Sequence, residues 1–184
     1  MEWSVGVLYV ESGGVVNDLP KRLEPYFKIA LEETKKSPCV RRKYAAMIVY
    51  DIYGDIGDEG TEWNPWHLAS NEGVTNQCKG QCIRDRYRTI HGQNMERGAE
   101  IHAEQAALIK AGIYRLHSYF IVVGTGKDGK ELLGANTFPC HACAVMLKWA
   151  GYTNIYRRDA KGLISPISVT DIIQYREAET EALL

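Results

Sequence analysis

Two short clusters of metal-binding side chains stand out in the sequence. One is a His-Ala-Glu triplet at 102–104, and the other is a Pro-Cys-His-Ala-Cys segment at 139–143. Cys140 and Cys143 are three residues apart, which places both sulfurs on one face of a helix. With the imidazole of His102 they supply three protein ligands to Zn²⁺ and leave the fourth tetrahedral position for water. That ligand count is typical of a catalytic zinc site.

Glu104 completes the chemistry that this site would need. Each cluster stands where we expect a helix to begin, so the positive ends of two helix dipoles point at the metal. The ion and the dipoles lower the pKa of a bound water from about 9 toward about 7 and make hydroxide available. Glu104 lies two residues after His102, and we expect it to carry the proton rather than bind the metal.

Two other interpretations of these clusters remain open. Cys140 and Cys143 alone would also fit a redox dithiol, but that gives His102 and Glu104 no task. A purely structural zinc site makes Glu104 an ordinary helix residue. A third motif, G-x-G-x-x-G at 124–129, follows a predicted strand as a dinucleotide fingerprint does. No long helix pattern and no suitably spaced acid follow that motif, so we predict a turn there.

Composition limits the class of protein. The chain has 184 residues, 45% of them hydrophobic and 24% charged, which fits one globular domain. Its net charge of −1 argues against a general polyanion binder. No apolar run is long enough for a membrane helix, and no basic leader precedes an apolar segment, so we expect a cytoplasmic protein. The five cysteines, at 39, 78, 82, 140 and 143, are then expected to be thiols or metal ligands.

Hydrophobic periodicity gives the elements that must position these residues. Helices are expected at 21–36, 103–111, 140–150 and 169–184, and strands at 44–50, 67–70, 119–123 and 154–156. Residues 1–20 form an N-terminal extension with a candidate extra strand, and 51–65 form an acidic insert. Residues 71–98 are polar and irregular. The alternation of strands and helices predicts one domain over 21–184, built as an α/β sandwich.

Several segments resemble the cytidine deaminase-like superfamily, in particular its deoxycytidylate (dCMP) deaminase branch. The H-x-E and P-C-x-x-C pair is the signature of zinc nucleobase deaminases. Ile101 to Leu108 (IHAEQAAL) and Thr137 to Ala144 (TFPCHACA) are close to the two zinc motifs of the branch. Ser37 to Arg42 (SPCVRR) is similar to its S-P-C-x-R turn. The resemblance covers about residues 21–158 and implies a three-layer α/β/α sandwich with a central mixed sheet of about five strands.

This resemblance implies hydrolytic conversion of dCMP to dUMP and ammonia. Hydroxide on zinc would add to C4 of the pyrimidine while Glu104 protonates N3. By the same analogy Asn71 would hold the sugar. The Ala103 N–H and the backbone around Thr137 and Phe138 would read the edge of the pyrimidine.

The resemblance also implies a second, structural zinc. Cys39, Cys78 and Cys82 occupy the places of its usual ligands, and such an ion would order the long polar segment. The branch often has a cysteine where Gly98 stands, so His91 is the best substitute for the fourth ligand.

Other departures from the branch concern the substrate. The segment Ala69-Ser70-Asn71-Glu72 replaces a G-Y-N-G sequence, and Ala160 stands where a tyrosine is common. Candidate phosphate partners by charge are Arg41, Arg42, Arg84 and Arg86. A free base, a nucleoside, a modified pyrimidine nucleotide or a base in tRNA or single-stranded DNA remain alternative substrates. The near-zero charge disfavours nucleic acid, and a zinc module without catalysis leaves Glu104 unexplained.

Further expectations concern partners. The resemblance implies a homo-oligomer, from dimer to hexamer, because members of this branch are commonly hexamers that dCTP activates and dTTP restrains. An open sheet also has edges that association would cover. We therefore expect a homo-oligomer that acts on a small-molecule nucleotide and has no membrane partner.

Zinc content tests the two-site hypothesis. We expect elemental analysis of the purified protein to give two zinc ions per chain. Substitution Cys39→Ser should remove one ion and lower stability, and the chemistry should stay recoverable. A single zinc in the unaltered protein would eliminate the site at Cys39, Cys78, Cys82 and His91.

Overall fold

The computed structural model describes residues 19–50, 66–73, 100–112 and 118–182. Residues 19 and 20 of the extension predicted at 1–20 belong to the first helix, whereas its residues 1–18 and the acidic insert at 51–65 lie outside these ranges. The same is true of most of the irregular segment, from 74 to 99, which contains Cys78, Cys82, Arg84, Arg86 and His91.

Five strands form a mixed sheet at the centre of the molecule. Across the sheet they are β2 (Trp66–Ser70), β1 (Lys43–Tyr50), β5 (Ser118–Thr125), β6 (Asn154–Arg158) and β7 (Ile164–Ser168). Strands β5 and β6 are parallel, and the other neighbouring pairs are antiparallel. Two short strands, β3 (Glu72–Gly73) and β4 (Glu100–Ile101), pair separately with each other.

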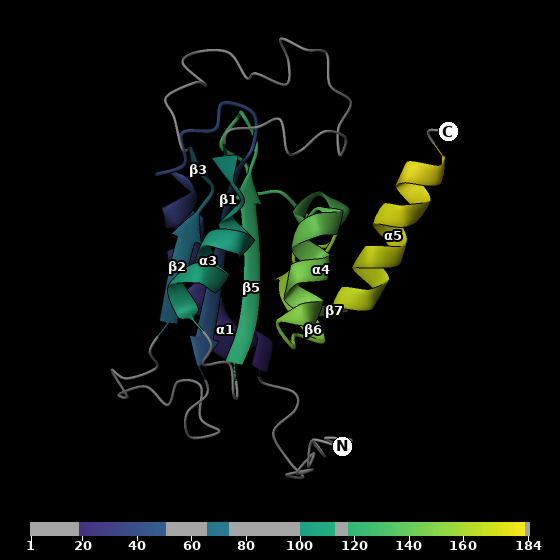
Figure 1. Cartoon of the computed structure of the whole chain (residues 1–184). Helices are drawn as coiled ribbons and strands as arrows, with labels where there is room; N and C mark the ends of the chain where they lie inside the picture. The colour runs from purple at the N-terminus through teal and green to yellow at the C-terminus, as the bar shows by residue number, and fades with distance from the viewer. Residues whose placement is uncertain (1–18, 51–65, 74–99, 113–117, 183–184) are drawn as a thin grey trace.

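Helices cover both faces of the sheet (Figure 1). Helix α1 (Leu19–Thr34) packs on one face, and α3 (Ala103–Ala111), α4 (His141–Trp149) and α5 (Val169–Glu181) lie on the other. A short 3₁₀ helix, η3 (Gly134–Thr137), leads into α4. The three-layer sandwich with a five-stranded mixed sheet is therefore confirmed.

The central strands explain why the core divides into two halves. In β1, Ala46 and Ile48 face α3 and α4, and the alternate residues Met47 and Val49 face α1. Side chains of a strand alternate between its two faces, and a strand covered on both faces is apolar throughout. This accounts for the unbroken run of hydrophobic residues that predicted a strand at 44–50.

The hydrophobic pattern of the sequence did not predict strand β7. Its sequence is Ile-Ser-Pro-Ile-Ser, and a proline in the middle of a short segment weakens the local signal for a strand. The structure places β7 at an edge of the sheet, where proline is tolerated because one side of the strand has no ladder to support. The predicted boundaries also shift slightly. Helix α1 begins at Leu19, and α5 ends at Glu181.

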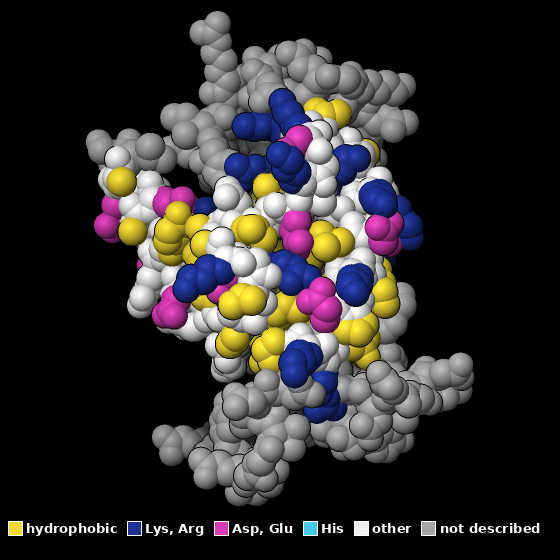
Figure 2. Space-filling model, turned by 180° about the vertical axis from the view of Figure 1, so that it is seen from behind, with side chains coloured by type: hydrophobic (Ala, Val, Ile, Leu, Met, Phe, Trp, Pro, Cys, Tyr) yellow, Lys and Arg dark blue, Asp and Glu magenta, His cyan; other side chains and the backbone are white. Residues whose placement is uncertain are grey.

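None of the described helices is long and apolar enough to cross a membrane. On the face seen in Figure 2, basic and acidic side chains are interspersed over most of the surface among hydrophobic ones. This view agrees with the near-zero net charge of the chain.

Arg158 of β6 joins α1 to the segment that follows β5. Its Nη2 donates to Glu24 of α1 at 2.7 Å, and its Nε donates to Glu131 at 3.0 Å. The guanidinium also lies 5.4 Å from the ring centroid of Phe27. The Arg158 side chain is 16% exposed, and those of Glu24 and Glu131 are 37% and 26% exposed, so these two ion pairs are partly shielded from water.

Loss of this arginine should therefore weaken the fold. We expect Arg158→Met to lower the free energy of unfolding by about 2 kcal/mol, because two partly buried carboxylates lose their partner. Urea titration of the zinc-loaded protein measures the change, with Lys28→Met on the exposed side of α1 as the matched loss of one charge. A decrease no larger than that of Lys28→Met would contradict the structural role of Arg158.

Candidate active site

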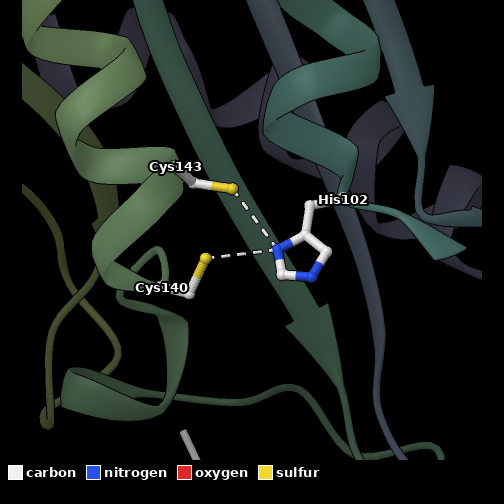
Figure 3. Close-up of side chains that lie close together, drawn as sticks. All are labelled: His102, Cys140 and Cys143. Carbon is white, nitrogen blue, oxygen red and sulfur yellow. Dashed lines mark hydrogen bonds between the residues drawn. The ribbon is translucent and has the colours of Figure 1, made fainter. Parts of the chain in front are cut away.

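Three metal-binding side chains converge where α3 and α4 begin (Figure 3). The sulfurs of Cys140 and Cys143 each lie 3.3 Å from Nδ1 of His102. In a tetrahedral zinc site with bonds of about 2.3 Å to sulfur and about 2.0 Å to nitrogen, these atoms would lie about 3.5 Å apart. One imidazole and two thiols at this spacing fit a zinc ion. Among the residues that the structure describes, these three form the group that could hold a metal.

His102 and Cys140 both have an extended backbone just before a helix begins. His102 is the residue before the first turn of α3, with φ −70° and ψ 149°, and Cys140 holds the same position at α4, with φ −64° and ψ 163°. The Gln105 side chain accepts a hydrogen bond from the His102 N–H at 3.2 Å, which fixes the start of α3. Both helix dipoles therefore favour negative charge at the metal position.

Burial and pairing set the protonation of the two thiols. Cys143 shares a hydrogen bond with Cys140, and this bond, with that from His102, lowers the pKa of Cys140 to about 4. The same pairing and burial raise the pKa of Cys143. One thiolate is thus favoured before any metal binds, and binding of zinc would release the second proton.

Glu104 lies in the first turn of α3 and is 6% exposed. Burial is the main reason that its pKa is raised, and the positive charges of His102 and Arg176 partly oppose this effect. A carboxyl group in such surroundings accepts and releases a proton more readily near neutral pH than an exposed one does. The pair of His102 and Glu104 therefore presents a metal ligand and an acid–base group from one turn of helix.

Arg176 of α5 fixes the segment that carries Cys140. Its Nε donates to the carbonyl of Pro139 at 3.0 Å, and its Nη2 donates to the carbonyl of Phe138 at 2.7 Å. Nη1 pairs with Glu179 at 2.6 Å. No sequence motif singled out Arg176, because it lies 36 residues after Cys140 and only the packing of α5 against α4 brings the two together.

Tyr44 and Asn71 join the ends of β1 and β2 beside this site. The Tyr44 N–H donates to Oδ1 of Asn71 at 2.8 Å, and the Asn71 N–H donates to the Tyr44 carbonyl at 3.0 Å. Asn71 is 5% exposed. The Tyr44 hydroxyl donates to the carbonyl of Asn136 at 3.0 Å, and burial raises its pKa. Tyr44 was missed at the sequence level because it looks like an ordinary strand residue.

The other residues expected to contact substrate occupy the loop before α4 and the first turn of α3. Ala103 is buried. The Thr137 hydroxyl is also buried and donates to the Gly134 carbonyl at 2.7 Å. Phe138 has both backbone groups engaged, since its N–H donates to Ala135 and its carbonyl accepts from Arg176.

Cys39 is the one predicted ligand of the second zinc that the structure describes. It is buried, and its N–H donates to the Ser37 hydroxyl at 3.2 Å. Cys78, Cys82 and His91 lie outside the described ranges, so the second site stays a prediction.

Comparison with known proteins places the chain in a family. Residues 20–157 match the model of the cytidine and deoxycytidylate deaminase zinc-binding region. The chain belongs to this family. The donor set of His102, Cys140 and Cys143 agrees with the zinc that this family binds. Together they support a zinc-dependent, hydrolytic deaminase.

A search of solved structures finds a variant of the cytidine deaminase from Mycobacterium tuberculosis. The two chains share 14% identity over 78% of this chain and 87% of the other, with a TM-score of 0.42. No curated protein sequence matches the chain.

The role of Arg176 can be tested through the metal. We expect Arg176→Met to lower zinc affinity by about tenfold, because the backbone that carries Cys140 loses two hydrogen bonds. Competition with a chromogenic chelator measures the affinity. Glu179→Gln is the matched control, since it removes only the exposed partner of Arg176. Equal zinc affinity in Arg176→Met and the unaltered protein would contradict this role.

Proposed function

We propose that this deaminase converts a cytosine nucleotide, most simply dCMP, into the uracil nucleotide and ammonia. The observation that carries the proposal is the meeting of His102, Cys140 and Cys143 at one point, with the buried side chain of Glu104 in the first turn of the same helix, α3. Three protein donors leave one position of a tetrahedral ion for a reactant.

The proposed reaction uses the chain's own groups as follows. Zinc, when bound by these three residues, lowers the pKa of a water molecule toward about 7 and so supplies a nucleophile at neutral pH. Glu104 takes the proton from the attacking water and delivers it to N3 of the pyrimidine. Glu104 then takes the remaining proton of the hydroxyl added at C4 and passes it to the exocyclic nitrogen, which leaves as ammonia as its bond to C4 breaks and the C4 carbonyl forms. The atoms balance as one water consumed and one ammonia released.

Substrate contacts follow from the groups that line the same helix starts. We propose that Asn71 contacts the sugar, and that the Ala103 N–H and the Thr137 backbone contact the edge of the base. Among the predicted contacts with the substrate, that of the Phe138 backbone has the least support, because its N–H and carbonyl already have hydrogen-bond partners. The dCMP assignment is supported by the family and by the sequence motifs shared with the deoxycytidylate branch.

Substitution of the acid–base residue tests this mechanism. We expect Glu104→Gln to keep its zinc and to lose about 10²- to 10⁴-fold in kcat, because the amide cannot carry the proton. Ammonia release and elemental analysis on the same sample measure both properties. Glu32→Gln, on the exposed side of α1, is the matched control. Full activity in Glu104→Gln would remove Glu104 from the mechanism.

A panel of substrates tests the class of molecule. Ammonia release should be greatest with dCMP among dCMP, dCTP, deoxycytidine, cytosine, guanine and single-stranded DNA. If guanine or single-stranded DNA were turned over fastest, the proposal that the substrate is a free cytosine nucleotide would be wrong.

A further inference from the structure

Two consecutive arginines of β6 lie in very different surroundings. Arg158 faces α1, where Glu24 and Glu131 neutralise it. Arg157 faces the opposite side of the sheet, the side that Ile155 shares with α4 and α5. Arg157 forms no ion pair with any residue that the structure describes. Two neighbouring cations of the same type thus differ in whether the described part of the chain balances their charge.

The guanidinium of Arg157 is held in place without being neutralised. Its Nη1 donates to the Arg158 carbonyl at 3.1 Å, and its centre lies 5.0 Å from the ring centroid of Phe138. Its Nε is buried and has no hydrogen-bond acceptor within the described ranges. Burial lowers the pKa of Arg157, which reflects the cost of keeping its charge there.

The nearest acid in the sequence does not supply the missing partner. Burial lowers the pKa of Arg157 more than the charge of Asp159 raises it, and the Asp159 Oδ1 accepts hydrogen bonds from the N–H groups of Lys161 and Leu163. A buried donor without a partner and a cation without a counter-charge each cost free energy. Such a group in a folded protein requires an explanation, and an anionic ligand provides one.

Arg157 is also close to the proposed reaction. The Phe138 ring on which it stacks belongs to the residue two positions before Cys140. Arg157 lies at the carboxyl end of β6, next to the parallel strand β5. In open α/β sheets, ligands bind outside the carboxyl ends of parallel strands. The side chain is partly exposed, so an anion can reach it from this edge.

We propose that Arg157 recognises the 5′-phosphate of the nucleotide substrate. This inference rests on the proposed function, because it assigns a specificity-determining residue to the same site. A phosphate monoester carries about −1.5 to −2 charges at neutral pH and offers several acceptor oxygens. The planar fork of a guanidinium can donate two parallel hydrogen bonds to it. The contacts with Phe138 and with the Arg158 carbonyl orient that fork before the ligand arrives.

The arginines that charge alone suggested are placed differently. Arg42 already forms a hydrogen bond with the Tyr44 hydroxyl. Arg41 lines a cavity of about 290 Å³ with Lys43 and Lys127, next to Cys39. Arg84 and Arg86 lie outside the described ranges. Arg157 is the described arginine that stacks on the segment leading to Cys140.

Binding of two product molecules tests the inference without requiring turnover. Calorimetry with the zinc-loaded protein should show that Arg157→Met weakens binding of dUMP by about 10- to 100-fold. Binding of deoxyuridine, which lacks the phosphate, should change less than twofold. Arg157→Lys should restore part of the dUMP affinity. Lys28→Met is the matched control for the loss of one positive charge and should bind both molecules normally.

Turnover and stability provide independent measurements. The value of kcat/KM should fall for dCMP by the same factor as dUMP binding, and that for deoxycytidine should not change. The urea midpoint of Arg157→Met should equal or exceed that of the unaltered protein, because the variant removes a partly buried charge that has no counter-charge within the described ranges. A single-stranded oligodeoxycytidylate should bind with equal affinity to Arg157→Met and to the unaltered protein.

Three results would overturn the inference. An equal loss of dUMP and deoxyuridine affinity would show that Arg157 only supports the fold. An unchanged dUMP affinity would show that another group binds the phosphate. A loss confined to the oligodeoxycytidylate would assign Arg157 to a nucleic-acid backbone. If no cytosine compound is deaminated and Arg157→Met still loses dUMP selectively, the proposed function fails and the phosphate site stands.

Discussion

The approach of two sulfurs to one imidazole nitrogen depends on where two helices begin. Helix α3 precedes β5 and α4 follows it, so both helices run back along β5 and start near its carboxyl end. His102 and Cys140 each occupy the position just before the first helical turn. Their side chains can therefore meet although 38 residues separate them. The crossover that makes β5 and β6 parallel keeps α4 on the same face as α3.

The rest of this face supports that meeting. Helix α5 provides Arg176, which holds the two carbonyls before Cys140. Tyr44 and Asn71 hold the ends of β1 and β2 together on the other side, and the Tyr44 hydroxyl reaches the loop before α4 at Asn136. The metal-binding residues are thus supported by hydrogen bonds to backbone groups, which do not depend on the identity of the side chains in the loop. Rigid ligands lower the cost of organising a metal site.

Sequence reasoning predicted those parts of the fold and site whose signals are local. The spacing of Cys140 and Cys143, the start of α3 at His102 and the apolar run of β1 follow from a few neighbouring residues. Arg176 and Arg157 carry no such signal. An arginine has the same local pattern whether it binds a carbonyl, a carboxylate or a ligand, and only the tertiary contacts distinguish these cases. Strand β7 was missed because Pro166 is acceptable only at a sheet edge, and edge position is a property of the whole sheet.

The register of β6 has a consequence for the proposed recognition of substrate charge by Arg157. A shift of one residue would exchange the faces of Arg157 and Arg158, because successive side chains of a strand point in opposite directions. The turn at 150–153, which leads from α4 into β6, opposes such a shift, since the N–H groups of Gly151 and Tyr152 donate to carbonyls at the end of α4 and Gly151 adopts φ 86°. The length of a surface turn therefore decides which cation faces the catalytic side. Insertion or deletion of one residue in this turn would be a short evolutionary route to altered charge preference, with every zinc ligand left in place.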